Sequence, residues 1–152
     1  MAPVLKEAGI PVALDAGSAT FRNAGRKEGY LEEDIPLIKT MLDAGIKVAG
    51  SSDCIVEPPH PLWGIAAAMD RHGINPSQAL SGRQALGLFT EGAAGSIRER
   101  PPLAVGSPAD LVVVDTDITA ASPEEVRTAQ VIETFVDGDA VAVDRELPVW
   151  MD

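Results

Sequence analysis

Several residue types that build common functional sites are scarce in this 152-residue sequence. It has one cysteine, Cys54, so no disulfide can form within the chain, which fits a reducing compartment. The 23 acidic residues outnumber the 12 basic ones, and the net charge of −11 argues against nucleic acid or an anionic membrane as a partner. No apolar run approaches the roughly 18 residues of a membrane span, and residues 1–9 lack the layout of a signal peptide. These absences predict a cytoplasmic protein.

Motifs for metal binding and nucleophilic catalysis are also missing. The two histidines, His60 and His72, are separated by a loop and most of a predicted helix, and there is no H-x-H, H-E-x-x-H or C-x-x-C motif. No glycine-rich phosphate loop and no Ser-His-Asp set can be assembled either. His72 is predicted to lie at a helix end, where it interacts with carbonyl groups, and Cys54 to be a small buried residue. The sequence therefore gives no sign of a complete metal site within this chain.

What is present is a globular composition, with 45% hydrophobic and 23% charged residues, and an alternation of helices and strands. We expect a helix end at 4–8, a strand at Ile10–Leu14, a polar loop to residue 30, a helix at Leu31–Ala44 and a strand at Ile46–Gly50. Because each strand directly follows a helix and a glycine, the pattern predicts two parallel strands of an α/β fold.

The rest of the chain divides into a helical part and a β part. Helices are expected at Leu62–Arg71, from Pro76, capped by Asn75, to about Leu86, and from a cap at Thr90 to Ala94. A charged, proline-rich connector at 98–108 precedes predicted strands at Leu111–Val114, Val131–Val136 and Ala140–Val143. Asp137-Gly138-Asp139 between the last two strands predicts a β-hairpin. Three such strands form only part of a sheet and leave an edge or an apolar face uncovered.

Asp53 is the strongest catalytic candidate from its position. It follows the strand Ile46–Gly50, and in parallel α/β folds the residues at the carboxyl ends of strands face the active site. A carboxylate there can bind a metal or accept a proton, although aspartate is also common as a cap of a turn or helix. Seven residues separate Asp53 from Pro61, the expected first helical residue, so we expect the carboxylate to face a cleft. Ser52 and His60 are candidates for the lining of the same pocket.

Residues 48–65, VAGSSDCIVEPPHPLWGI, resemble the eighth-strand motif of the amidohydrolase superfamily. They are most similar to amidohydrolase family 3, which includes exoenzyme-regulatory and N-substituted formamide deformylase-like proteins. Residues 102–115, PLAVGSPADLVVVD, resemble the segment in which these enzymes leave the barrel and re-enter a β-sandwich. The resemblance covers residues 31–143 and is weaker over 1–30.

The resemblance implies an α/β fold: the last strand–helix units of a TIM-type (β/α)8 barrel in residues 1–97, followed by the C-terminal strands of a small composite β-sandwich in 98–152. It implies hydrolysis of non-peptide C–N bonds in a small amide or cyclic amide. Asp53 would be a metal ligand and proton shuttle, with a divalent metal, usually zinc, in the complete enzyme.

The sequence also departs from the family pattern. A complete barrel needs about 250 residues, and the family's histidine ligands and bridging lysine or glutamate have no counterpart here. The chain alone is therefore expected to be inactive, to bind no metal tightly, and to act with a missing N-terminal part or as a homo-oligomer. The alternative is a non-catalytic, truncated module with an assembly or binding role.

Overall fold

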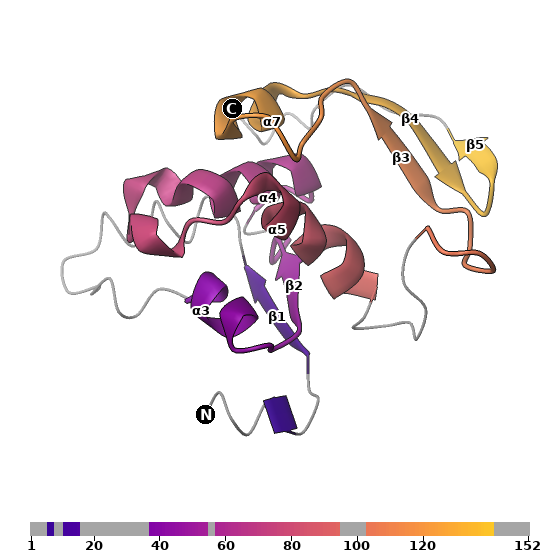
Figure 1. Ribbon diagram of the computed structural model, residues 1–152. Coiled ribbons are helices and arrows are strands. Elements are labelled where there is room, and N and C mark those ends of the chain that lie inside the picture. Colours follow the sequence, from indigo (N-terminus) through magenta and orange to yellow (C-terminus); the bar gives the residue numbers. More distant parts are fainter. Residues whose placement is uncertain (1–5, 8–10, 16–36, 55–56, 95–102, 142–152) are drawn as a thin grey trace.

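The computed structural model describes residues 6–7, 11–15, 37–54, 57–94 and 103–141 of the chain. They form two separate sheets with helices between them (Figure 1). In chain order the elements are β1 (Val12–Asp15), α3 (Ile38–Asp43), β2 (Val48–Ser51), α4 (Pro61–Asp70), η2 (Arg71–Gly73), η3 (Pro76–Gln78), α5 (Gly82–Gly87), η4 (Leu88–Gly92), β3 (Leu111–Val114), α7 (Pro123–Thr128), β4 (Val131–Val136) and β5 (Asp139–Val141).

β1 and β2 pair in parallel, with Val12 opposite Val48 and Asp15 opposite Ser51, which confirms the predicted strand direction. The connection ends with α3 and with Gly45, whose φ of +76° glycine adopts without strain. Each strand begins two residues later than predicted. Residues 31–36 of the predicted helix lie outside the described residues, as does most of the polar loop. Within the expected helix end at 4–8, Lys6 and Glu7 are helical.

The hydrophobic core lies around α4. Its residues Ile65–Ala68, which make one full turn, are almost fully buried, and the three alanines allow neighbouring helices to approach closely. Both α5 and α7 pack on α4. The same core includes Ile38, Val48, Leu80 and Leu88. At about 25 cal/mol per Å² of apolar surface removed from water, this burial is the main stabilising contribution to the unit. No helix in the described ranges is long and apolar enough to cross a membrane.

The prediction of one continuous helix from Pro76 to Leu86 is wrong, because the residues between η3 and α5 are not helical. Asn75 has a φ of +46° and its side chain caps nothing; three residues of 3₁₀-helix follow. Leu80 instead enters the core and donates its N–H to the carbonyl of Ala68, 3.0 Å away. A capping box between Ser81 and Gln84 then starts α5. Tertiary packing of Leu80 overrides the start signal at Asn75-Pro76.

Thr90 was predicted to cap a further helix, and this is also wrong. α5 continues directly into η4, a π-helical segment, so Thr90 lies inside a helix. Its hydroxyl donates to the carbonyl of Leu86 at 2.9 Å.

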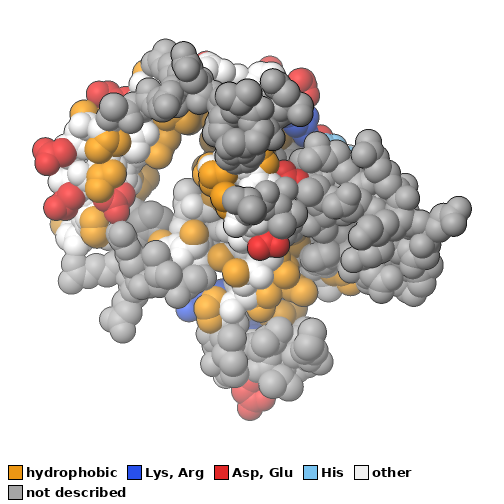
Figure 2. Space-filling model, turned by 180° about the vertical axis from the view of Figure 1, so that it is seen from behind, with side chains coloured by type: hydrophobic (Ala, Val, Ile, Leu, Met, Phe, Trp, Pro, Cys, Tyr) orange, Lys and Arg blue, Asp and Glu red, His pale blue; other side chains and the backbone are white. Residues whose placement is uncertain are grey.

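β3, β4 and β5 form an antiparallel sheet, as the strand pattern predicted. Asp137 and Gly138 both have positive φ, 54° and 89°, which is the type I′ geometry preferred in two-residue hairpins. The predicted hairpin is therefore confirmed, with β5 at Asp139–Val141. Hydrophobic and acidic side chains alternate over the exposed surface of this sheet (Figure 2).

α7 was not predicted. It lies between β3 and β4 in the chain, and a capping box between Ser122 and Glu125 starts it. The S-x-x-E pattern followed by Val126 is the signal that could have identified it. Val126 is fully buried against α4, and Arg127 forms an ion pair with Asp70 of α4 at 2.7 Å. α7 thus fixes the C-terminal segment to the first core (Figure 1).

Candidate active site

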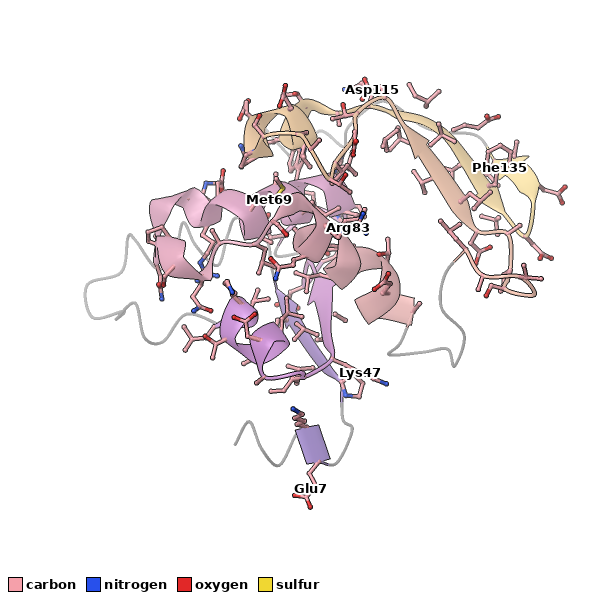
Figure 3. The ribbon with its side chains drawn as sticks, in the orientation of Figure 1. Glu7, Lys47, Met69, Arg83, Asp115 and Phe135 are labelled. Carbon is pink, nitrogen blue, oxygen red and sulfur yellow. The ribbon has the colours of Figure 1, made fainter. Side chains whose placement is uncertain are left out.

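The candidate site begins at the carboxyl end of β2. Lys47, directly before this strand, lies on the side of Glu7 and away from Met69 of α4 (Figure 3), so the strand runs toward the helical layer. Asp53 follows two residues after β2 with a φ of +47°, and its N–H donates to the Ser51 hydroxyl at 3.2 Å. The first residue before α4 is His60, whose side chain makes no cap bond. Asp53 therefore closes a turn after β2 and does not cap α4.

A cavity of about 270 Å³ opens beside this turn. It is smaller than the roughly 300–1,000 Å³ of pockets for drug-sized ligands, so it suits a small molecule or one group of a larger one. Its lining combines three prolines, three aromatic or imidazole rings and a few polar groups: Gly50, Ser51, Ser52, Glu57, Pro58, Pro59, His60, Pro61, Trp63, Gly64 and Phe89.

The sequence-derived candidates are placed differently by the structure. Ser52 and His60 both line the cavity, eight positions apart in the chain. Asp53 is exposed and is not part of the lining, which differs from the expectation that its carboxylate faces the cleft. Cys54 is exposed as well, so the prediction of a buried cysteine is wrong. The reason is the same for both: β2 ends at Ser51, and the left-handed residue Asp53 breaks the strand alternation.

His60 is held in the wall of the cavity by its neighbours. Its ring stacks on Trp63, with the ring centroids 5.0 Å apart and an interplanar angle of 24°. The backbone N–H of His60 donates to the carbonyl of Pro58 at 2.7 Å, and the ring Nδ1 is buried with no hydrogen-bond partner among the described residues. Burial lowers the pKa of His60 by desolvating the imidazolium. The neutral ring is thus favoured, and it can serve as a hydrogen-bonding or stacking group rather than as a cation.

Three further lining residues had no predicted role in the pocket. Glu57 is only 4% exposed, and its N–H donates to the carbonyl of Ser52 at 3.2 Å, which folds the loop back over the strand end. Trp63 could have been recognised from the sequence, because residues three apart at a helix start lie on one face. Phe89 carried no such signal, since it comes from η4, far along the chain.

The described residues do not fit a complete metal centre. No group of three or more His, Cys, Asp or Glu side chains within them could hold an ion. Zinc sites need three or four protein ligands, and here Asp53 offers one exposed carboxylate. Any metal bound through Asp53 would require ligands from elsewhere.

Comparison with known proteins identifies relatives of one kind. The amidohydrolase family profile matches residues 1–142. YtcJ of Bacillus subtilis, named as an amidohydrolase, is 34% identical over 114 residues, covering 68% of this chain and 22% of YtcJ. The N-substituted formamide deformylase of Arthrobacter pascens is 32% identical over 109 residues, covering 66% of this chain and 20% of the deformylase.

Solved structures show the same fold. A 5-methylcytosine deaminase from Klebsiella pneumoniae, crystallised with phosphonocytosine, superposes with a TM-score of 0.63 at 21% identity over 97% of this chain and 37% of the deaminase. A crystal structure of an amidohydrolase gives a TM-score of 0.56 at 21% identity, over 95% of this chain and 37% of that one. This chain thus spans about a fifth of the length of the curated relatives it matches.

Proposed function

Because this chain belongs to the amidohydrolase family, we propose that it forms the C-terminal part of a metal-dependent hydrolase of non-peptide C–N bonds. The substrate class is a small amide or cyclic amide. The names of an amidohydrolase, a formamide deformylase and a cytosine deaminase among its relatives support this class. The observation that carries the proposal is the position of Asp53, two residues after a parallel strand and next to Ser52 of the cavity.

Each candidate residue has a proposed role in the complete enzyme. Asp53 supplies one carboxylate to the catalytic centre, where the family's divalent metal, zinc in our proposal, would be bound with ligands from outside the described residues. Ser52 and His60 contact the substrate, since both line the cavity. The neutral imidazole of His60, stacked on Trp63, suits an uncharged, planar amide group better than an ionic one.

We assign residues 1–97 to the end of the barrel and 98–152 to the C-terminal part of a small β-sandwich. The parallel pair β1–β2 and the antiparallel sheet β3–β4–β5 support this division. α7 and Ile118, which belong to the second segment, nevertheless pack into the hydrophobic core around α4, so the two segments are in contact. The exposed apolar residues of this sheet are covered either by a missing N-terminal part of the protein or by a second copy. The single cysteine fits a cytoplasmic enzyme.

The proposed function can be tested on the complete reading frame that contains this chain. The encoded protein is assayed for hydrolysis of N-substituted formamides and cyclic amides, beside Asp53→Asn. If Asp53 binds metal and transfers protons, the substitution lowers kcat by about 10²–10⁴-fold and reduces the metal content. The matched control is Cys54→Ser, at the neighbouring exposed residue, which keeps both. Full activity and full metal content in Asp53→Asn would contradict the assignment.

A further inference from the structure

Phe89 lines the cavity from an element that carries none of the proposed catalytic residues. It belongs to η4, a π-helical segment that continues α5. π-helical turns are rare and frequently occur at functional sites. Leu88, the preceding residue, is 1% exposed and belongs to the core, whereas Phe89 is only partly buried. Leu88 thus holds η4 in the core, and Phe89 packs against that core while part of its ring lines the cavity.

Glycines on three different elements make room for this arrangement. A Cβ at Gly92 would lie 2.1 Å from the carbonyl oxygen of Val48, so the backbone of η4 rests directly on β2. A Cβ at Gly50 of β2 would lie 2.6 Å from the Phe89 ring, and one at Gly64 of α4 would lie 2.5 Å from it. The ring therefore occupies a slot between β2 and α4 that only glycine leaves open.

The slot lies between the two groups of polar cavity residues. Gly50 directly precedes Ser51 and Ser52, and Gly64 directly follows Trp63, the stacking partner of His60. A group that enters the cavity between these residues meets the exposed part of the Phe89 ring. Because the ring lies against both β2 and α4, its position depends on the space that these two elements leave.

We propose that Phe89 sets the depth of the cavity and is thereby the residue that determines the size of the substrate group bound there. The inference rests on the proposed function in one respect, since it takes the cavity as the substrate pocket. A smaller side chain at position 89 deepens the cavity. A side chain at position 64 pushes the ring and makes the cavity shallower.

The test is a binding measurement on the 152-residue chain with three neutral amides of increasing size: acetamide, benzamide and 2-naphthamide. Binding is followed by the indole N–H signal of Trp63 in ¹⁵N-edited NMR spectra, in a Trp150→Phe background so that one indole remains. In Phe89→Ala the affinity for 2-naphthamide relative to benzamide rises at least tenfold, the scale on which pockets discriminate small differences in apolar size. In Gly64→Ala the same ratio falls, and benzamide itself binds more weakly.

Controls separate a size effect from a loss of structure. Phe89→Leu keeps an apolar side chain and gives a smaller change in the same direction as alanine, which maintains the test if Phe89→Ala does not fold. Phe135→Ala removes an aromatic ring from β4, away from α4 (Figure 3), and leaves the ratio unchanged. An unchanged ratio in both Phe89 variants, or no shift of the Trp63 signal with any amide, would overturn the proposal. If the complete protein hydrolyses no amide but the ratio still changes, the proposed function fails and the role of Phe89 stands.

Discussion

Ile65 of α4 and Val112 of β3 are both branched apolar residues, but the first is 2% exposed and the second 59%. The elements that carry these two residues also differ in how far their apolar side chains are buried. α4 is packed by α5 and α7, whereas β3, β4 and β5 form a sheet whose apolar side chains include Val113, Ile132 and Val136 at 44%, 46% and 53% exposure. A stable sheet buries its apolar face against a second layer. The core around α4 is therefore covered within this chain, whereas the C-terminal sheet exposes apolar side chains as one layer of a larger structure would.

The sharpest way to test this comparison is to truncate one residue in each region. Ile65→Ala removes a fully buried side chain and should lower the free energy of unfolding by about 2–5 kcal/mol. Val112→Ala, in the exposed sheet, should change it by less than about 0.5 kcal/mol at protein concentrations low enough to keep the chain monomeric. Urea unfolding followed by circular dichroism measures both. Equal losses would mean that the sheet is covered even in the monomer.

A second test concerns the contact between η4 and β2. In Gly92→Ala the new Cβ meets the backbone oxygen of Val48, which cannot rotate away, and we expect a loss of about 3 kcal/mol. Gly87→Ala is the matched control, because beyond the adjacent residues and backbone of its own helix no atom lies within 4 Å of its Cβ position. Since alanine favours a helix over glycine, this control should be more stable than the original by about 0.5–1 kcal/mol. Thermal unfolding of the two variants under the same conditions gives their midpoint temperatures. Similar midpoints would contradict the close approach of Gly92 to the backbone of Val48.

The exposed sheet predicts self-association. Val112 and Val141 both pair with Thr134, and Val136 lies two residues further along β4, so all three point to one face. Sedimentation velocity should give a mass above the 15.9 kDa of the chain. Val112→Lys with Val136→Lys should restore the monomer. Val105→Lys, at a fully exposed loop residue outside the sheet, should leave the mass unchanged. A monomer at all concentrations would contradict the prediction.

The smallest expected effect concerns His60, in the wall of the cavity. Burial holds its pKa below the ordinary value of about 6.5, so the unfolded chain binds this proton more readily than the folded one. The folded state therefore keeps its full stability above the pKa of the unfolded chain. It loses part of that stability as the pH falls from there through the pKa of the folded state. NMR titration of the His60 ring should give the low midpoint, and His60→Gln should flatten this part of the pH dependence of unfolding. A midpoint above 6.5 would disprove the desolvation.

Local signals in the sequence predicted much of the fold. Gly45 ends a helix, Asp137-Gly138 forms a hairpin, and the two strands that follow helices are parallel, because each depends on backbone preferences within a few residues. The break at residues 79–81 and the π-helical segment around Thr90 could not be predicted in this way. They depend on the packing of Leu80 against α4 and of Gly92 against β2, contacts that join distant parts of the chain.

The positions of the candidate residues, though not their roles, could be predicted to a similar extent. Ser52 and His60 line the cavity because both lie in the loop that joins β2 to α4. Phe89 was missed because it reaches the cavity from a later helix, and the exposure of Asp53 and Cys54 was missed because the strand ends before them. The role of Asp53 as a metal ligand is a proposal that rests on its position after β2 and on the family.

The central claim is that Asp53 belongs to a metal centre which these residues do not complete, and metal analysis of the purified 152-residue chain tests it most directly. The chain and Asp53→Asn are dialysed against zinc, passed over a desalting column and analysed by mass spectrometry for bound metal. Because one carboxylate cannot supply three or four ligands, we predict no tightly held zinc in either protein. One zinc per chain in the original protein, absent from Asp53→Asn, would contradict the account.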